Sequence, residues 1–204
     1  MERPDTSQTR SAATAHATTQ AVPGLEVRAL LATDPIAPIT ALLHRAYAGQ
    51  VGAGLSPLAG RQSIEVTRQR CYRGQTFVAL KPGGGTPSGD FADRLLGTIL
   101  FQEREDAGFP PWFLRTDVTH FSQFAVEPSL QRAGVGRVLL ECVERATLEL
   151  GCTELALSMA EPDVPLRTYY ERRGYRVVQT WQWPYTNYTS LIMSKTLSSR
   201  KDDR

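Results

Sequence analysis

The segment from Gln131 to Arg137, which reads QRAGVGR, constrains the fold of this chain more than any other. It lies between a strand-like run, residues 120–126, and a run with helical spacing, residues 135–150. A glycine-containing turn that opens a helix directs several unpaired backbone N–H groups to one side, at the positive end of the helix dipole. Glycine also lets a ligand approach the backbone closely. The segment therefore predicts a strand, a tight turn and a helix that together form a phosphate site.

Two basic side chains, Arg132 and Arg137, add positive charge where a diphosphate would lie. The sequence lacks the string G-x-x-x-x-G-K-[ST] of a P-loop, and Leu139 stands where a Rossmann fingerprint would need its third glycine. Both of these better-known phosphate loops are therefore excluded. A glycine turn that only packs a helix onto a sheet stays open as the alternative.

Residue patterns elsewhere in the chain predict further strands and helices. Alternating or apolar runs predict strands at residues 25–30, 76–80, 95–101, 177–183 and 188–195. Helical spacing predicts helices at residues 36–47 and 63–73, with Ser63 as the N-cap of the second. We expect a single domain over residues 23–197, preceded by a disordered arm rich in Thr, Ser, Ala and Gln (residues 1–22) and followed by a polar tail (residues 198–204).

The composition is that of an ordinary globular protein, with 41% apolar and 22% charged residues in a chain of 204. The net charge of +2 gives no electrostatic case for nucleic acid or a membrane as partner, and no apolar run approaches the roughly 20 residues that span a bilayer. The three cysteines, Cys71, Cys142 and Cys152, form no C-x-x-C pair and are typical of a cytoplasmic protein. The three histidines are too dispersed to predict a metal site.

The glycine turn matches [QR]-x-x-G-x-[GA], the signature of the GNAT superfamily of acyl-CoA-dependent N-acyltransferases, which this chain resembles. The resemblance continues with a strand-like run at 154–159 and with 166–175, which ends in Y-E-x-x-G-[FY]. It covers roughly residues 121–197. It implies an α+β (α/β) fold, with a mixed, mostly antiparallel central sheet of about six to seven strands flanked by about four helices. The implied order is β-α-α-β-β-β-α-β-α-β-β.

The same resemblance implies an N-acetyltransferase that moves an acetyl group from acetyl-CoA to a primary amine of a small molecule or peptide. The amine would attack directly in a ternary complex, without a metal. The acyl-CoA would lie in a V-shaped opening between the strand that ends at Val126 and the strand that begins near Glu154. The N–H group of Val126 would face the thioester carbonyl. The implied cofactor-binding residues are Phe124, Ala125, Val126, Gln131, Arg132, Ala133, Gly134, Val135, Gly136, Arg137 and Asp163.

Asp163 departs from the family pattern, because many relatives carry an asparagine at this position. Tyr170 stands where the superfamily often has a tyrosine that protonates the leaving thiolate. A phenol suits that step, since its pKa of about 10 is close to that of a thiol. His120 is the candidate general base, because its strand carries no acid before Glu127. A histidine that only bonds a neighbouring carbonyl is the alternative, with Glu103 and Asp117 as second choices for the base.

The acceptor would enter beside residues 49–60, the loop around Trp112, and the turn at 183–187. Aromatic groups there could receive an apolar or cationic amine, or they could close a homodimer. Two other functions stay open. One is a non-catalytic domain that binds acyl-CoA, and the other is an acetyltransferase for protein N-termini or lysines.

Overall fold

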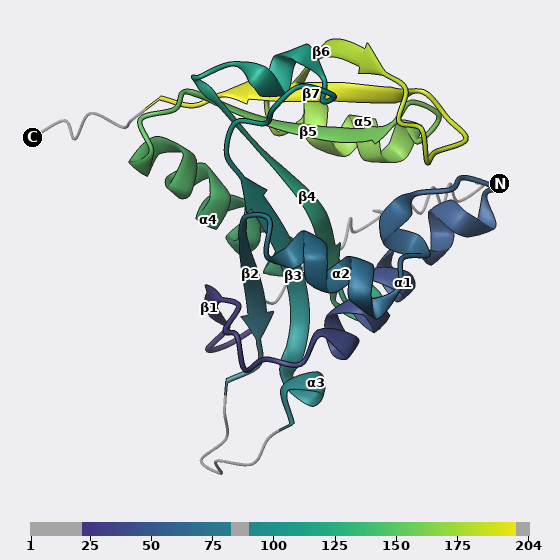
Figure 1. Ribbon diagram of the computed structural model, residues 1–204. Coiled ribbons are helices and arrows are strands. Elements are labelled where there is room, and N and C mark those ends of the chain that lie inside the picture. The colour runs from purple at the N-terminus through teal and green to yellow at the C-terminus, as the bar shows by residue number, and fades with distance from the viewer. Residues whose placement is uncertain (1–21, 83–89, 199–204) are drawn as a thin grey trace, which may run out of the picture.

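The computed structural model describes residues 22–82 and 90–198. A seven-stranded sheet in the order β1-β2-β3-β4-β5-β7-β6 forms its centre (Figure 1). The strands are β1 (Glu26–Ala29), β2 (Gln75–Leu80), β3 (Leu95–Gln102), β4 (Val118–Val126), β5 (Glu154–Ala160), β6 (Arg176–Trp181) and β7 (Ser190–Thr196). All neighbouring pairs are antiparallel except β4 and β5. The predicted fold class is therefore confirmed.

Five α-helices accompany the sheet: α1 (Ile36–Gly52), α2 (Ile64–Cys71), α3 (Phe91–Arg94), α4 (Val135–Glu149) and α5 (Val164–Glu171). The sequence predicts four, and the additional one is the single turn of α3. The prediction also ends the first helix at Tyr47, but α1 continues to Gly52. A glycine inside a helix costs only about 1 kcal/mol, so the glycines of that segment do not stop it. Ser63 caps α2 as predicted, because its hydroxyl accepts a hydrogen bond from Val66 N.

Two predictions concern segments that lie wholly or largely outside the described residues, namely the arm at 1–22 and the tail at 198–204. Val22, the last residue of the predicted arm, is described and packs half-buried against the core. The domain boundaries at 23 and 197 stay predictions.

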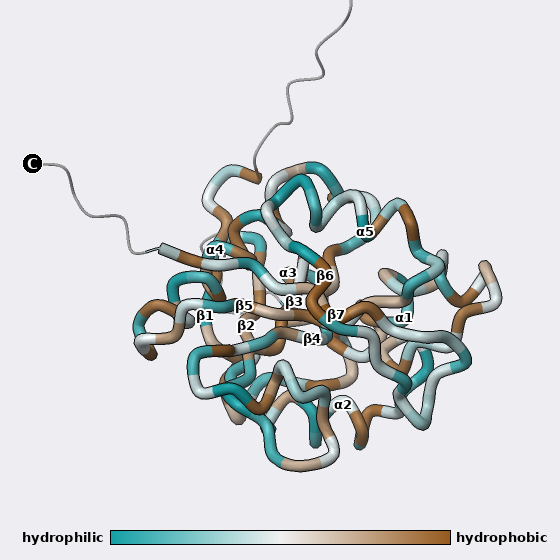
Figure 2. Tube along the Cα trace, turned by 90° about the horizontal axis from the view of Figure 1, so that it is seen from above, coloured by the Kyte–Doolittle hydropathy of each residue, from teal (hydrophilic) through white to brown (hydrophobic). Residues whose placement is uncertain are grey.

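The sheet has a helical layer on each face. Helix α4 packs on β2, β3 and β4, and α5 joins the same apolar cluster through Tyr170. Helices α1 and α2 cover the opposite face. Strand β2 shows why, because its side chains alternate: Ala79 belongs to the α4 cluster, and Val78 and Leu80 belong to the α1 cluster. Figure 2 shows that the segments around β3 and β4 are mostly apolar and that the outer connections are more hydrophilic.

The buried face of α4 differs from the apolar stripe that the sequence suggests. Leu150 is 49% exposed and Cys142 is only half-buried, although both fit the apolar spacing. Thr147 is fully buried instead. Its hydroxyl lies 2.7 Å from that of Thr119 on β4 and donates to Val143 O, so this polar side chain is satisfied inside the core.

Strands β4 and β5 pair only over their first halves, Val118–Phe121 with Glu154–Leu157. Beyond Ser122 the register of β4 with β3 shifts by one residue, and Gln123 has a φ of 48°. Such a β-bulge bends its strand. Strand β4 therefore leaves β5, and Figure 1 shows the two strands diverging. The V-shaped opening expected from the sequence has its structural cause in this bulge.

Candidate active site

The glycine turn has the geometry of an anion site. Gly134 is the N-cap of α4 with φ 87°, a left-handed conformation that residues with a Cβ rarely adopt. The first backbone hydrogen bond of the helix runs from Val138 N to Gly134 O, at 3.2 Å. The N–H groups of Val135, Gly136 and Arg137 therefore have no carbonyl partner within the helix and point out of its positive end.

A cavity of about 800 Å³ lies in front of this turn, and we name it the turn cavity. Parts of β4, α1 and α5 form its other walls. Nine of the predicted cofactor residues line it: Phe124, Ala125, Val126, Gln131, Arg132, Gly134, Gly136, Arg137 and Asp163. Ala133 and Val135 do not line it. The Val135 side chain is fully buried in the core, so only its backbone N–H is available to a ligand.

The backbone of β4 presents free donors to the opening between the strands. Glu127 N donates to Leu96 O of β3 at 2.8 Å. Because successive N–H groups of a strand point to opposite sides, the N–H of Val126 is turned away from β3 and toward the space that β5 vacates. A hydrogen-bond donor thus lies where the resemblance expects the thioester carbonyl.

Asp163 has a structural task that the sequence did not reveal. Its carboxylate accepts a hydrogen bond from Leu166 N at 3.1 Å and so caps the first turn of α5. The other carboxylate oxygen accepts from Gln50 of α1 at 2.8 Å. Asp163 therefore ties two walls of the turn cavity together, and a role in binding the cofactor stays a prediction.

Tyr170 lies on α5, only 4% exposed, and lines the turn cavity. Its ring packs against Phe121 at 6.1 Å and against Tyr175 at 5.4 Å, measured between ring centroids. Burial raises the pKa of Tyr170 well above its usual 10. The hydroxyl is therefore protonated throughout the physiological range and is able to donate a proton.

A second cavity of about 430 Å³ lies on the other side of β4, and we name it the aromatic cavity. Its aromatic lining consists of Tyr47, Phe109, Phe113, Phe121, Trp183, Tyr185 and Tyr188. Polar groups of β3 and β4, among them Gln102, His120 and Ser122, also face it. Tyr47 lines both cavities, so the two adjoin. Tyr170 and Phe121 pack together across the same boundary.

His120 is 4% exposed and stacks on Phe113, with ring centroids 4.2 Å apart. Its Nε2 lies 3.2 Å from Oε1 of Glu105. Burial outweighs this carboxylate and lowers the pKa of His120 below 6.5, so the imidazole is neutral at pH 7. The alternative that this histidine only bonds a neighbouring carbonyl did not foresee the carboxylate of Glu105 as its partner.

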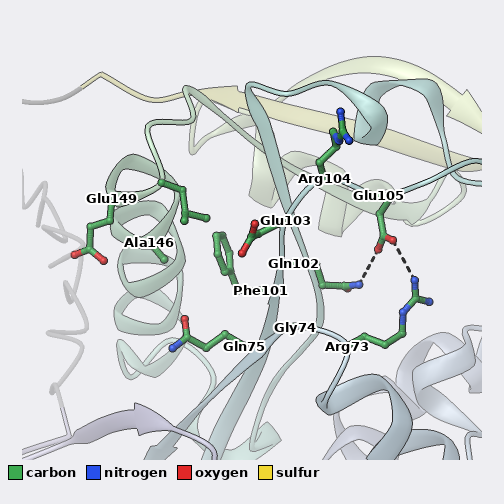
Figure 3. Close-up of a pocket in the computed structure, with 11 residues that line it drawn as sticks. Arg73, Gly74, Gln75, Phe101, Gln102, Glu103, Arg104, Glu105, Ala146 and Glu149 are labelled. Carbon is green, nitrogen blue, oxygen red and sulfur yellow. Dashed lines mark hydrogen bonds and ion pairs between the residues drawn. The ribbon is translucent and has the colours of Figure 1, made fainter.

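Glu105 is held in place by two further side chains, which Figure 3 shows with dashed lines. Gln102 donates to one carboxylate oxygen at 2.8 Å and Arg73 donates to the other at 3.0 Å. The second choices for the base do not share this arrangement. Glu103 is exposed in a separate cavity, and Asp117 is a partly exposed partner of Arg115 at 2.6 Å.

That separate cavity, of about 440 Å³, lies between the end of β3 and the last turns of α4 (Figure 3). It includes Gly74, Glu103 and Glu149. Tyr170, His120 and the predicted cofactor residues do not line it. It contains Glu103, a second choice for the base, and it shares Arg73 and Gln102 with the aromatic cavity. We therefore place the candidate active site in the two adjoining cavities.

Two connections meet over the aromatic cavity. Asn187, in the turn between β6 and β7, accepts a hydrogen bond from Ser56 N and donates one to Gly54 O, both at 2.8 Å. Arg61 donates to Tyr185 O of the same turn. These bonds join the segment after α1 to the β6–β7 turn. The entry of the acceptor beside these two connections stays a prediction.

Within residues 22–82 and 90–198, no three His, Cys, Asp or Glu side chains gather in a way that could hold a metal ion. No helix in this part of the chain is both long and apolar enough to cross a bilayer.

Comparisons with known proteins agree with this geometry. Residues 59–175 match the Acetyltransferase (GNAT) family, and the match ends at Tyr175, which closes the Y-E-x-x-G-[FY] pattern. A comparison with curated proteins gives no match.

Among solved structures, the fold is similar to the ribosomal-protein-S18-alanine N-acetyltransferase from Escherichia coli, with a TM-score of 0.59 and 17% identity over 88% of this chain and 98% of that one. It is also similar to a GNAT family acetyltransferase from Elizabethkingia anophelis with acetyl-CoA bound (TM-score 0.54, 14% identity, 86% and 99% covered). A third is the IAA acetyltransferase from Bacillus cereus ATCC 14579 (TM-score 0.54, 16% identity, 85% and 99% covered). The identities of 17%, 14% and 16% are low, so the likeness shows the fold alone.

Proposed function

Because the chain belongs to the Acetyltransferase (GNAT) family and is an acetyl-CoA-dependent acyltransferase, we propose that it acetylates the primary amine of a small molecule by direct attack in a ternary complex. One observation carries this proposal. Two cavities adjoin at Tyr47, one beside the unpaired N–H groups of α4 and the other lined by aromatic side chains. Donor and acceptor can then be bound together, with their reacting groups meeting at the end of β4.

The proposed reaction needs three contributions from the protein, and positioning is the largest. The N–H groups at the start of α4, with Arg132 and Arg137, hold the diphosphate of acetyl-CoA. The N–H of Val126 stabilises negative charge on the thioester oxygen as the amine attacks. Tyr170 gives its hydroxyl proton to the departing thiolate.

We assign the remaining proton, which leaves the attacking amine, to His120. The neutral imidazole faces the aromatic cavity and can accept this proton directly or through water. Glu105, 3.2 Å away, then stabilises the imidazolium that forms. Glu105 acts through His120 and is a positioning residue.

A small acceptor is favoured over a protein N-terminus by the contacts that cover the aromatic cavity. The hydrogen bonds of Asn187 to Ser56 and Gly54 join the two connections through which an extended peptide would pass. A peptide would have to break them, whereas a small amine need not.

The three cysteines are free thiols, which supports the cytoplasm as the location that we propose.

Initial-rate kinetics test the ternary complex. We expect acetyl-CoA and the amine to give intersecting lines in double-reciprocal plots, because no cysteine among the described residues lines either cavity as a carrier for the acetyl group. The buried thiol of Cys71 does not line either cavity. Parallel lines would contradict direct attack, and an absence of thiol release with every amine would favour a domain that only binds acyl-CoA.

The pH dependence of kcat/KM tests His120. After correction for the neutral fraction of the amine, we expect kcat/KM to be constant above pH 6.5 and to fall below it, where a buried histidine with a lowered pKa takes up its proton. His120→Gln should lower kcat about a hundredfold and abolish this acid limb. His44→Gln is the control, because among the described residues the Nε2 of His44 hydrogen-bonds only the backbone carbonyl of Gln62, at 2.9 Å, and a glutamine can donate to the same carbonyl. An unchanged acid limb in His120→Gln would remove the histidine from the mechanism.

A further inference from the structure

The aromatic cavity is lined by two guanidinium groups, those of Arg70 and Arg73, and by no carboxylate among the described residues. Arg73 is already paired, because it donates to Glu105 and lies over the ring of Phe109. Arg70 differs from it. Its one hydrogen bond within the described part of the chain goes to the neutral side-chain oxygen of Gln62, at 2.7 Å.

A partly buried guanidinium without an anionic partner is unfavourable, since desolvation of its charge is not offset by an ion pair. Burial lowers the pKa of Arg70, yet a guanidinium keeps its charge at neutral pH. The cavity therefore has a positive potential that the protein itself leaves uncompensated. A bound anionic group would compensate it.

The position of Arg70 is fixed by a buried polar network. Gln62, 3% exposed, accepts from Arg70 and donates to Thr67 at 2.9 Å and to Gln123 at 2.7 Å. Gln123 is the residue at the bulge of β4. Arg70 is thus held rigidly relative to the point where the two cavities adjoin, as a group that recognises one part of a substrate must be.

We propose that the acceptor is an amino acid, or a similar small amine that carries a carboxylate, and that Arg70 binds this carboxylate. This inference rests on the proposed function and narrows its acceptor. The planar guanidinium can donate two parallel hydrogen bonds to a carboxylate. The aromatic residues around Trp183 receive the side chain of the substrate. A polycationic acceptor would meet Arg70 and no carboxylate among the described residues that line the cavity, so the charge of the cavity disfavours such an acceptor.

Matched pairs of amines test this inference. Thiol release from acetyl-CoA is measured with the amino acids and with amines of the same side chain that lack the carboxylate, such as phenylalanine against phenethylamine and leucine against 3-methylbutylamine. We expect kcat/KM to be at least about tenfold higher for the preferred amino acid than for its decarboxylated partner. In Arg70→Gln, which keeps a donor for Gln62, this preference should be lost, so that both members of a pair react at rates within about threefold of each other. Arg70→Lys should retain part of it.

Arg68→Gln, two residues away on the exposed side of α2, removes the same charge and should keep the preference. An unchanged KM for acetyl-CoA shows that each variant is folded. Equal rates for both members of each pair, or a preference that survives in Arg70→Gln, would overturn the inference while leaving the acetyltransferase intact. Absence of turnover with every amine, although acetyl-CoA binds, would overturn the proposed function itself and this inference with it.

Discussion

Tyr170→Phe is expected to lower kcat about a hundredfold or more and to change the KM for acetyl-CoA by less than about threefold. The reason is that the substitution removes only the hydroxyl that protonates the leaving thiolate, and general acid catalysis contributes about 10²- to 10⁴-fold. The ring, which packs against Phe121 and Tyr175, is retained. Because burial raises the pKa of Tyr170 well above 10, wild-type kcat should not fall between pH 7 and 9 through loss of this proton. Steady-state thiol release measures both quantities.

Tyr175→Phe provides the matched control. Tyr175 is also buried, at 3% exposure, and its hydroxyl has no hydrogen-bond partner among the described residues. Removal of an unsatisfied buried hydroxyl should leave kcat unchanged and raise the free energy of unfolding by about 1 kcal/mol. If Tyr170→Phe retains wild-type kcat, or if both variants lose activity equally, Tyr170 is not the acid.

The second large effect is expected at the glycine turn. Arg137→Glu should raise the Kd for acetyl-CoA about ten- to a hundredfold, because it replaces a cation beside the diphosphate by an anion. The fold should tolerate the change. An acidic side chain in the first turn of α4 interacts favourably with the helix dipole, and the exposed ion pair with Glu141 that is lost contributes at most about 1 kcal/mol. Isothermal titration calorimetry with acetyl-CoA measures the shift.

Arg145→Glu makes the same change of charge on the same helix, at an exposed position outside both cavities. We expect it to change the Kd by less than about twofold at physiological salt, where distant charges are screened. Equal losses of affinity in the two variants would mean that only the net charge of the protein matters and would contradict a diphosphate site at this turn.

The parts of this structure that follow from the sequence are those with a local cause. The helical period of residues 135–150 and the glycines before it predict α4 and its positive-φ N-cap, because both depend on neighbours in sequence. The apolar stripe was still placed imperfectly. Leu150 fits the helical period but is exposed. The buried face includes Thr147 instead, because its hydroxyl pairs with that of Thr119 on a strand that is distant in sequence.

The rest of the candidate site depends on contacts between distant segments. Nothing in a residue's neighbourhood indicates that Glu105 meets His120, because the connection between them has no period. The bulge at Gln123 could not be predicted from the sequence either, because glutamine is not a residue type that favours a positive φ. From the sequence alone, Arg70 would be expected to lie on the solvated face of a helix. Only the tertiary structure places it in a cavity that no carboxylate among the described residues lines.

The central claim is that main-chain donors at the start of α4 hold the diphosphate of coenzyme A. A crystal structure of the protein with coenzyme A tests it most directly. We expect diphosphate oxygens within about 3.2 Å of the backbone nitrogens between Gly134 and Arg137, with the pantetheine arm running along Phe124–Val126 toward Tyr170. A nucleotide bound away from this turn, for example in the cavity beside Glu149, would contradict the account.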